Sequence, residues 1–165
     1  MSINKAVPTN FELSIPDIPG GTTEETEQVL LQLIETVIPG MDITPIDTHW
    51  MGVVARRDSS VGIDFQSWSV TFFVDADFGN WKTLHNWVKY ASEEQPLPED
   101  HNINMFLSVK NNFGEEVIRL LFLNVWIKSL GEVRLSSQEG DTYIQCNATF
   151  EYSRYDVFAS EEEIV

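Results

Sequence analysis

Residues 68–87 read WSVTFFVDADFGNWKTLHNW, and this stretch contains both kinds of regular structure that the chain is expected to use. Its first part alternates between apolar and small polar side chains, which predicts a strand with one buried face. The apolar positions are Trp68, Val70, Phe72 and Val74. After an acidic turn at Asp75–Asp77, apolar residues recur every three or four positions from Phe78 to Ala91, which predicts an amphipathic helix capped by Asp77.

The same alternation occurs on both sides of this stretch. It predicts strands at Phe11–Pro16, Ile103–Val109 and Ile144–Tyr152. Residues Glu116–Leu123 are apolar at almost every position, which predicts a strand buried on both faces between two layers. Many strands and one clear helix indicate a mainly β protein, an antiparallel β-sandwich or barrel with one flanking α-helix.

One segment fits two structures. Thr22–Ile38 opens like a capped helix, and its apolar residues fit helical spacing. Alternate residues from Val29 to Leu33 fit a strand equally well, and Pro39-Gly40 ends either element. Both alternatives remain open from the sequence.

Composition limits the classes of function. The length of 165 residues predicts a single domain, residues 1–165, with a flexible N-terminal arm at 1–10 and an acidic tail at 159–165. The 26 acidic and 10 basic residues give a net charge of −16, which disfavours nucleic acid and acidic membranes as binding partners. Such charge serves solubility in many proteins. It would also suit a surface that DNA must pass without sticking.

The chain lacks the patterns of known catalytic centres. Cys146 is the only cysteine, and it reads as a small buried hydrophobic residue. His49, His85 and His101 are far apart and have no partner at metal-ligand spacing. Asp75 and Asp77 are better explained by a turn and a helix cap than by a cation site. We therefore predict no catalytic, metal-binding or cofactor-binding residues, and no cofactor.

The order of several short segments carries a resemblance. These segments are Asn10–Pro16, Val37–Met41, Phe65–Asp75, Asp77–Trp87, Leu130–Val133 and Cys146–Tyr152. The order resembles that of the tail tube proteins of contractile-tailed bacteriophages and their relatives at the baseplate. It runs from about Phe11 to Phe158, and the strand, acidic turn and helix from Trp68 to Trp87 are its most specific part.

The resemblance implies an assembly as well as a fold. In this family six subunits close into a ring whose inner wall is a β-barrel, and rings stack into a hollow tube inside a sheath. The implied partners are further copies of the chain, the tail sheath protein, and the baseplate and tail-terminator proteins. Phage DNA would pass through without specific binding. The implied location is the virion tail, assembled in the host bacterial cytoplasm, with no membrane contact.

The resemblance also suggests which residues make contacts. Family members stack through the N-terminal arm and a long loop between early strands, which here would be Met41–Asp64. The apolar residues of this loop, together with Phe11 next to the N-terminal arm, are the expected ring-stacking residues. They are Phe11, Trp50, Met51, Val53 and Val54. The alternative is a β-hairpin folded onto its own core. The acids expected to face the lumen are Glu12, Asp64 and Glu151.

Two other functions stay open at this point. Gly20–Glu27 is longer and more polar than a plain hairpin turn, so the chain could instead form a tube-initiator or tube-end adaptor ring at the baseplate or neck. A more distant alternative is a small acidic protein, either an enzyme or a DNA-mimic inhibitor, which rests on the net charge alone.

Overall fold

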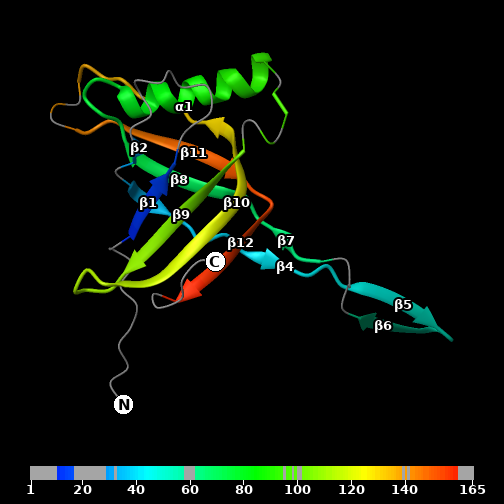
Figure 1. The fold of residues 1–165 in the computed structure, drawn as a ribbon. Helices are drawn as coiled ribbons and strands as arrows, with labels where there is room; N and C mark the ends of the chain where they lie inside the picture. Colours follow the sequence, from blue (N-terminus) through cyan, green and yellow to red (C-terminus); the bar gives the residue numbers. More distant parts are fainter. Residues whose placement is uncertain are drawn as a thin grey trace.

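The structure is a computed structural model that describes residues 11–16, 29–31, 33–57, 62–94, 96–97, 99, 102–138, 140 and 142–159. The expected N-terminal arm, the Gly20–Glu27 segment and the acidic tail beyond Ala159 lie outside these residues. The fold class is confirmed, because the described residues form antiparallel β-structure with one α-helix (Figure 1).

Within the described residues, most strands belong to one eight-stranded sheet with the order β2-β1-β9-β10-β11-β8-β3, and β12 pairs with β10 beside this path. All pairings are antiparallel. The strands are β1 (Phe11–Ile15), β2 (Val29–Leu30), β3 (Leu33–Thr36), β8 (Trp68–Phe73), β9 (Ile103–Lys110), β10 (Glu116–Leu130), β11 (Gln145–Glu151) and β12 (Arg154–Ala159). The described part of Thr22–Ile38 therefore contains two short strands and no helix.

The long strand β10 joins two layers. Its first half pairs with β9 and β12, and its second half pairs with β11. The change of direction falls at Asn124, which has a positive φ of 54°, and the register with β9 shifts between Phe122 and Val125. In Figure 1, β8 and β11 consequently run across the view while β9 and the first half of β10 cross them obliquely.

The core lies between these layers and is strongly aromatic. The ring of Trp68 stacks on Phe122 with a centroid distance of 4.0 Å, and its Nε1 donates a hydrogen bond to Thr36 Oγ1 at 2.9 Å. The inward positions of β1, β8, β9 and β11 are the ones that alternation predicts. The largest fully buried side chains include Leu13, Val70, Phe72, Met105, Leu107, Leu120 and Phe150.

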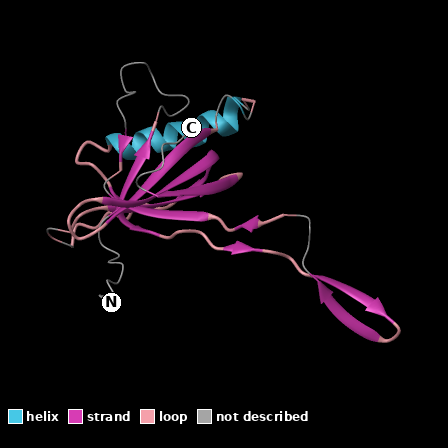
Figure 2. Ribbon diagram, turned by 60° about the horizontal axis from the view of Figure 1, so that its bottom comes forward, coloured by secondary structure: helices cyan, strands magenta, loops and turns pink. Residues whose placement is uncertain are grey.

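The helix α1 (Gly79–Lys89) lies above the strands in Figure 2, and a π-helical turn, η1 (Tyr90–Glu94), follows it. Leu84 and Trp87 are buried, with Trp87 6.0 Å from the ring of Phe150. The expected start of the helix is wrong by one position. Phe78 occupies the cap position with φ 60°, and the Asp77 carboxylate accepts the amide hydrogen of Gly79 at 3.1 Å from the preceding turn.

The expectation that Glu116–Leu123 is buried on both faces is also wrong. Leu120 and Phe122 point into the core, whereas Val117 is exposed and Leu121 and Leu123 are half-buried on the outward face. No described layer covers that face within the subunit. An apolar run can therefore indicate a face that another molecule covers, as well as a second core face.

The residues between β3 and β8 leave the body. The strands β4 (Met41–Asp42) and β7 (Asp64–Phe65) pair first, and further out β5 (Ile46–Trp50) pairs with β6 (Val53–Arg57). We call the segment from Met41 to Phe65 the arm; it extends toward the lower right in Figures 1 and 2.

Candidate assembly interface

The outer part of the arm is a β-hairpin with a two-residue turn. Trp50 pairs with Val53 and Ile46 pairs with Arg57 at the two ends of the ladder. The turn residues Met51 and Gly52 both have positive φ, 47° and 79°. Positive φ at both positions is the turn geometry whose twist matches that of paired strands. Gly52 adopts this geometry without strain, whereas Met51 adopts it at a cost in backbone energy.

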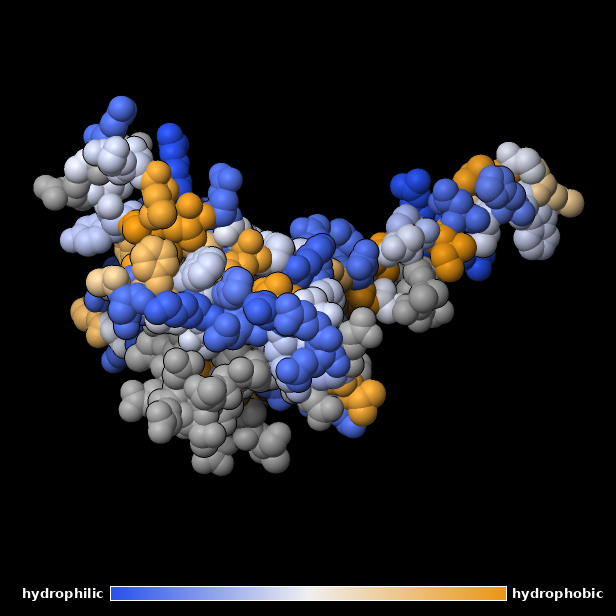
Figure 3. All heavy atoms as spheres, turned by 90° about the horizontal axis from the view of Figure 1, so that it is seen from above, coloured by the Kyte–Doolittle hydropathy of each residue, from blue (hydrophilic) through white to orange (hydrophobic). Residues whose placement is uncertain are grey.

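The hairpin does not pack against the core of the subunit. Every residue of β5 and β6 is exposed, and Figure 3 shows the arm projecting clear of the body with apolar residues along it. The exposed fractions are 74% for Trp50, 91% for Met51 and 67% for Val53. The arm is thus a hairpin, but it is not folded onto its own core.

The structure brings the four expected arm residues together at the outer end. Trp50 and Val53 are directly opposite each other and share one face. Val54 lies opposite His49 on the other face, and Met51 is in the turn between the strands. Sequence reasoning missed Ile43, Ile46 and Ile63, which are also at least 45% exposed. Their apolar character in a protruding segment was the available signal.

The base of the arm is fixed to the body by hydrogen bonds. The amide of Gln66 donates to the Gly40 carbonyl at 3.1 Å. The hydroxyl of Tyr155 donates to the Pro39 carbonyl at 2.9 Å, and that of Tyr152 donates to the Gln66 carbonyl at 2.8 Å. The two segments that connect the arm to the sheet, at Pro39–Gly40 and at Gln66, are therefore both held at its base.

Aromatic packing reinforces this base. The Phe65 ring contacts Tyr152 and Tyr155 edge-on, with centroid distances of 5.8 and 5.4 Å. Burial raises the pKa of the Tyr152 hydroxyl, and the nearby Tyr155 and Glu151 add to that effect, so Tyr152 stays a neutral donor. The sequence could not show these contacts, because Tyr155 and Pro39 are 116 residues apart.

Phe11 lies in a different environment from the arm residues. It is half-buried at the start of β1 and packs against the core cluster. The structure therefore gives Phe11 an intramolecular role, and its role in ring stacking stays a prediction.

The three acids expected to face a lumen do not come together in the subunit. Glu12 is on the outward face of β1, Asp64 is in β7 at the arm, and Glu151 is on the outward face of β11. Hydrogen bonds from Ser67 and Lys128 lower the pKa of Glu151, against the opposing effect of partial burial. The lumen assignment of these residues is still a prediction.

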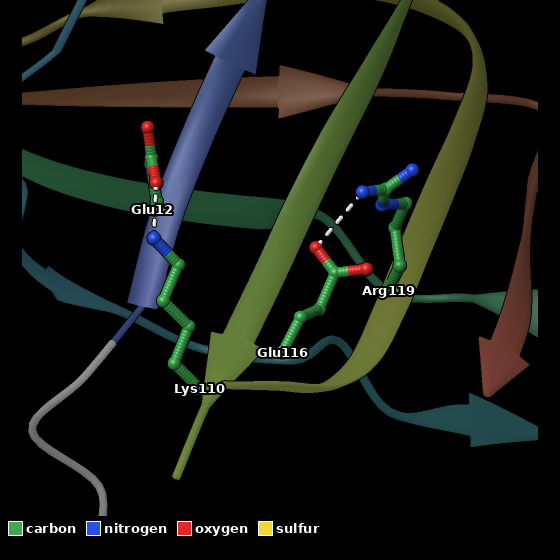
Figure 4. Close-up of polar contacts among 4 residues, drawn as sticks. All are labelled: Glu12, Lys110, Glu116 and Arg119. Atoms are coloured by element: carbon green, nitrogen blue, oxygen red, sulfur yellow. Dashed lines mark hydrogen bonds and ion pairs between the residues drawn. The ribbon is translucent and has the colours of Figure 1, made fainter. Parts of the chain in front are cut away.

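Glu12 belongs to a group of charges on the outward face of β1, β9 and β10 (Figure 4). Lys110 Nζ lies 2.6 Å from Glu12 Oε2, and Arg119 Nη2 lies 3.0 Å from Glu116 Oε2. Partial burial alone would raise the pKa of Glu116, but hydrogen bonds from Ser108 and Arg119 outweigh it and leave the pKa below 4.5. The Glu116 carboxylate is therefore ionised and paired with Arg119 near neutral pH.

The described residues contain no group of three or more His, Cys, Asp or Glu side chains placed to hold a metal ion. Cys146 is buried, and burial raises the pKa of its thiol, which disfavours the nucleophilic thiolate.

His85, one of the three histidines considered as metal ligands, has its ring stacked on Trp81 with a centroid distance of 5.0 Å. Within the part of the chain that the structure describes, no helix is long and apolar enough to cross a membrane.

Comparison with known proteins gives the family. Residues 6–158 match the sequence profile of the phage tail tube protein family. This chain is a member of that family. No curated protein matches the tail tube chain by sequence. The resemblance seen in the sequence is therefore confirmed by a match that includes both the arm and the sheet.

Solved structures with this tail tube fold have little sequence identity to the chain. A chain of the anti-feeding prophage baseplate is 11% identical with a TM-score of 0.68, covering 98% of this chain and 100% of the other. A chain of the PVC sheath/tube terminator is 15% identical with a TM-score of 0.69, covering 96% and 100%. The Hcp1 protein from E. coli EAEC 042 is 9% identical with a TM-score of 0.58, covering 93% of each. These likenesses show the fold.

Proposed function

We propose that this tail tube family member is a structural subunit that forms hexameric rings, and that the rings stack into the hollow tube of a contractile phage tail. Phage DNA passes through this tube. The role is non-enzymatic, and the protein is located in the virion tail after assembly in the host cytoplasm. The observation that carries the proposal is the arm. In a solitary subunit its apolar residues would be exposed to water, with no stabilising burial.

The arm supports stacking because its apolar end can be buried only against another molecule. Trp50, Met51 and Val53 are exposed in the subunit, and an exposed group of large apolar residues marks an interaction surface. Its base is held by Tyr152 and Tyr155, so the arm is presented in a defined direction. A second copy in the next ring is the partner that a repeating tube requires.

The further partners follow from the family. A third similar chain, 14% identical with a TM-score of 0.66, comes from the PVC sheath–tube complex. We accordingly propose the tail sheath protein, the baseplate and the tail terminator as contacts of the assembled tube.

An adaptor ring at a tube end is the second candidate. The similar chains come from a baseplate, a sheath/tube terminator and a sheath–tube complex, with TM-scores of 0.68, 0.69 and 0.66. A main tube protein is present in hundreds of copies per particle, whereas an adaptor ring has six or twelve. Quantitative gel analysis of purified particles separates the two roles.

The test of stacking replaces the apolar end of the arm. In a variant carrying Trp50→Ser, Met51→Ser and Val53→Ser, we expect rings that no longer stack, measured by sedimentation velocity and negative-stain microscopy. The control carries Trp50→Phe, Met51→Leu and Val53→Ile, keeps the apolar surface, and should stack like the wild type. Tubes of normal length from the serine variant would contradict the proposal.

A further inference from the structure

The net charge of the chain is not carried by its sheet. The strands of the eight-stranded sheet hold five acidic and four basic residues, a net of −1. The acids are Glu12, Glu35, Glu116, Glu151 and Asp156, and the basic residues are Lys110, Arg119, Lys128 and Arg154. The rest of the chain therefore holds 21 acidic and 6 basic residues, a net of −15.

Each of the four basic side chains of the sheet is ion-paired with a carboxylate of the same sheet. The N–O distances are 2.6 Å for Lys110–Glu12, 3.0 Å for Arg119–Glu116, 2.9 Å for Lys128–Glu151 and 3.7 Å for Arg154–Asp156. The first two pairs are drawn in Figure 4. No basic side chain in these strands is without an acidic neighbour.

The pairs occur on both outward faces. Lys110, Arg119 and Arg154 lie on the face formed by β1, β9, β12 and the first half of β10. Lys128 lies on the other face, beside β11. There, Asn147 Nδ2 donates to Ser69 Oγ at 3.0 Å and to Thr71 Oγ1 at 3.3 Å, so these amide and hydroxyl groups also bond to each other.

This arrangement has a specific consequence for DNA. Proteins hold DNA without sequence preference mainly through lysine and arginine side chains that neutralise phosphates and release counterions. A basic side chain with a carboxylate 2.6–3.7 Å away offers little net attraction to a phosphate. Ion pairs with at least one exposed partner add little to folding stability, so stability alone does not account for four of them.

We propose that the carboxylates of the sheet mask its four basic side chains, so that a bore lined by this sheet lets double-stranded DNA pass without retaining it. The inference rests on the proposed tube function and deepens it. On this inference, the strands of the wall carry paired charges with a net of −1. The excess negative charge belongs to the segments outside the sheet.

The experiment reverses the charge of acidic side chains on one face of the sheet at a time. The first-face variant carries Glu12→Lys and Glu116→Lys, on the face of β1, β9, β12 and the first half of β10. The second-face variant carries Glu151→Lys, on the face that includes β11. The matched controls are Glu94→Lys with Glu132→Lys, and Glu132→Lys alone, which change the net charge equally at exposed positions outside the sheet. Thermal unfolding identifies folded variants. The milder pair Glu12→Gln and Glu116→Gln replaces the first-face variant if it fails to fold, and Glu94→Gln with Glu132→Gln is then its control.

The readout is retention of linear double-stranded DNA by the purified protein, measured by co-sedimentation at low and high salt. We expect at least one sheet variant to retain about tenfold more DNA than its control, with the excess lost as salt rises. Equal retention by a control, or no gain in either sheet variant, would overturn the inference. A failure of the tube function is seen separately, as wild-type protein that forms no rings in micrographs.

Discussion

At the residue scale, Glu151 links two distant parts of the second sheet face. Its carboxylate accepts hydrogen bonds from Ser67 and from Lys128 Nζ, the latter at 2.9 Å. These donors, Ser67 first, hold the pKa of Glu151 below its ordinary value of 4.5. A lowered folded-state pKa means that the contribution to stability is present above pH 4.5 and is lost as the pH falls through the folded-state pKa.

We therefore expect Glu151→Gln to weaken the acid sensitivity of the protein. The difference in thermal midpoint between wild type and Glu151→Gln should be largest near neutral pH and should shrink on acidification below pH 4.5. Glu132→Gln, at an exposed position outside the sheet, is the control and should follow the wild-type profile. A constant difference at all pH values would contradict this account.

Gly131 is the single glycine of Leu130–Val133, one of the segments that resemble the tail tube family, and the structure shows why a glycine is needed there. Its amide donates to the Asn147 carbonyl at 2.6 Å, and a Cβ added there would lie only 2.8 Å from the same oxygen. Because that oxygen belongs to the backbone of β11, it cannot move aside easily. We expect Gly131→Ala to lower the free energy of unfolding by about 1–3 kcal/mol in urea titrations. Gly140→Ala is the control, because a Cβ there meets nothing within 4 Å.

At the element scale, the bend in β10 depends on Asn124. Its positive φ of 54° is unfavourable for most residues, and asparagine and glycine tolerate it best. Both Asn124→Gly and Asn124→Ala lose the side-chain bond to Ser153 Oγ. Only alanine also adds backbone strain, so we expect Asn124→Ala to be less stable than Asn124→Gly by about 1–2 kcal/mol in chemical denaturation. Equal stabilities would show that the bend is not strained.

Loss of a tryptophan should destabilise the subunit strongly in the core and hardly at all in the arm. Trp68 is fully buried, so Trp68→Ala should destabilise the subunit by about 3–5 kcal/mol. Trp50 is 74% exposed, so Trp50→Ser should change the stability of the unassembled subunit by less than about 0.5 kcal/mol. Thermal unfolding of the separated subunit measures both. A large loss in Trp50→Ser would mean that the arm contributes to the subunit fold.

The strands were the part of the fold that could be predicted from the sequence, for a local reason. Alternation at Trp68–Val74 and Ile144–Tyr152 depends only on which side chains face the core, and β8 and β11 follow it. The bend at Asn124 could not be predicted, because it serves pairing with two different partners. The helix cap at Phe78 was missed because the tight turn places Asp77 one residue too early.

The candidate interface was predictable only in part. Trp50, Met51, Val53 and Val54 were identified because the family resemblance implied a stacking loop at Met41–Asp64, and these are its large apolar residues. The pair of Lys110 with Glu12 was not predictable, since the two residues are 98 positions apart and meet only through the register of β1 and β9. Composition gave the net charge, but only the fold shows that the charge lies outside the sheet.

At the scale of the whole molecule, the account makes one central claim: the subunit is incomplete alone, because the apolar end of its arm lacks a partner among the described residues. Electron cryomicroscopy of the purified full-length protein at high concentration tests this claim most directly. We predict six-fold rings stacked coaxially, with the Trp50–Val53 end of each arm buried against the next ring. A monomer at all concentrations, or rings in which that end stays in solvent, would contradict it.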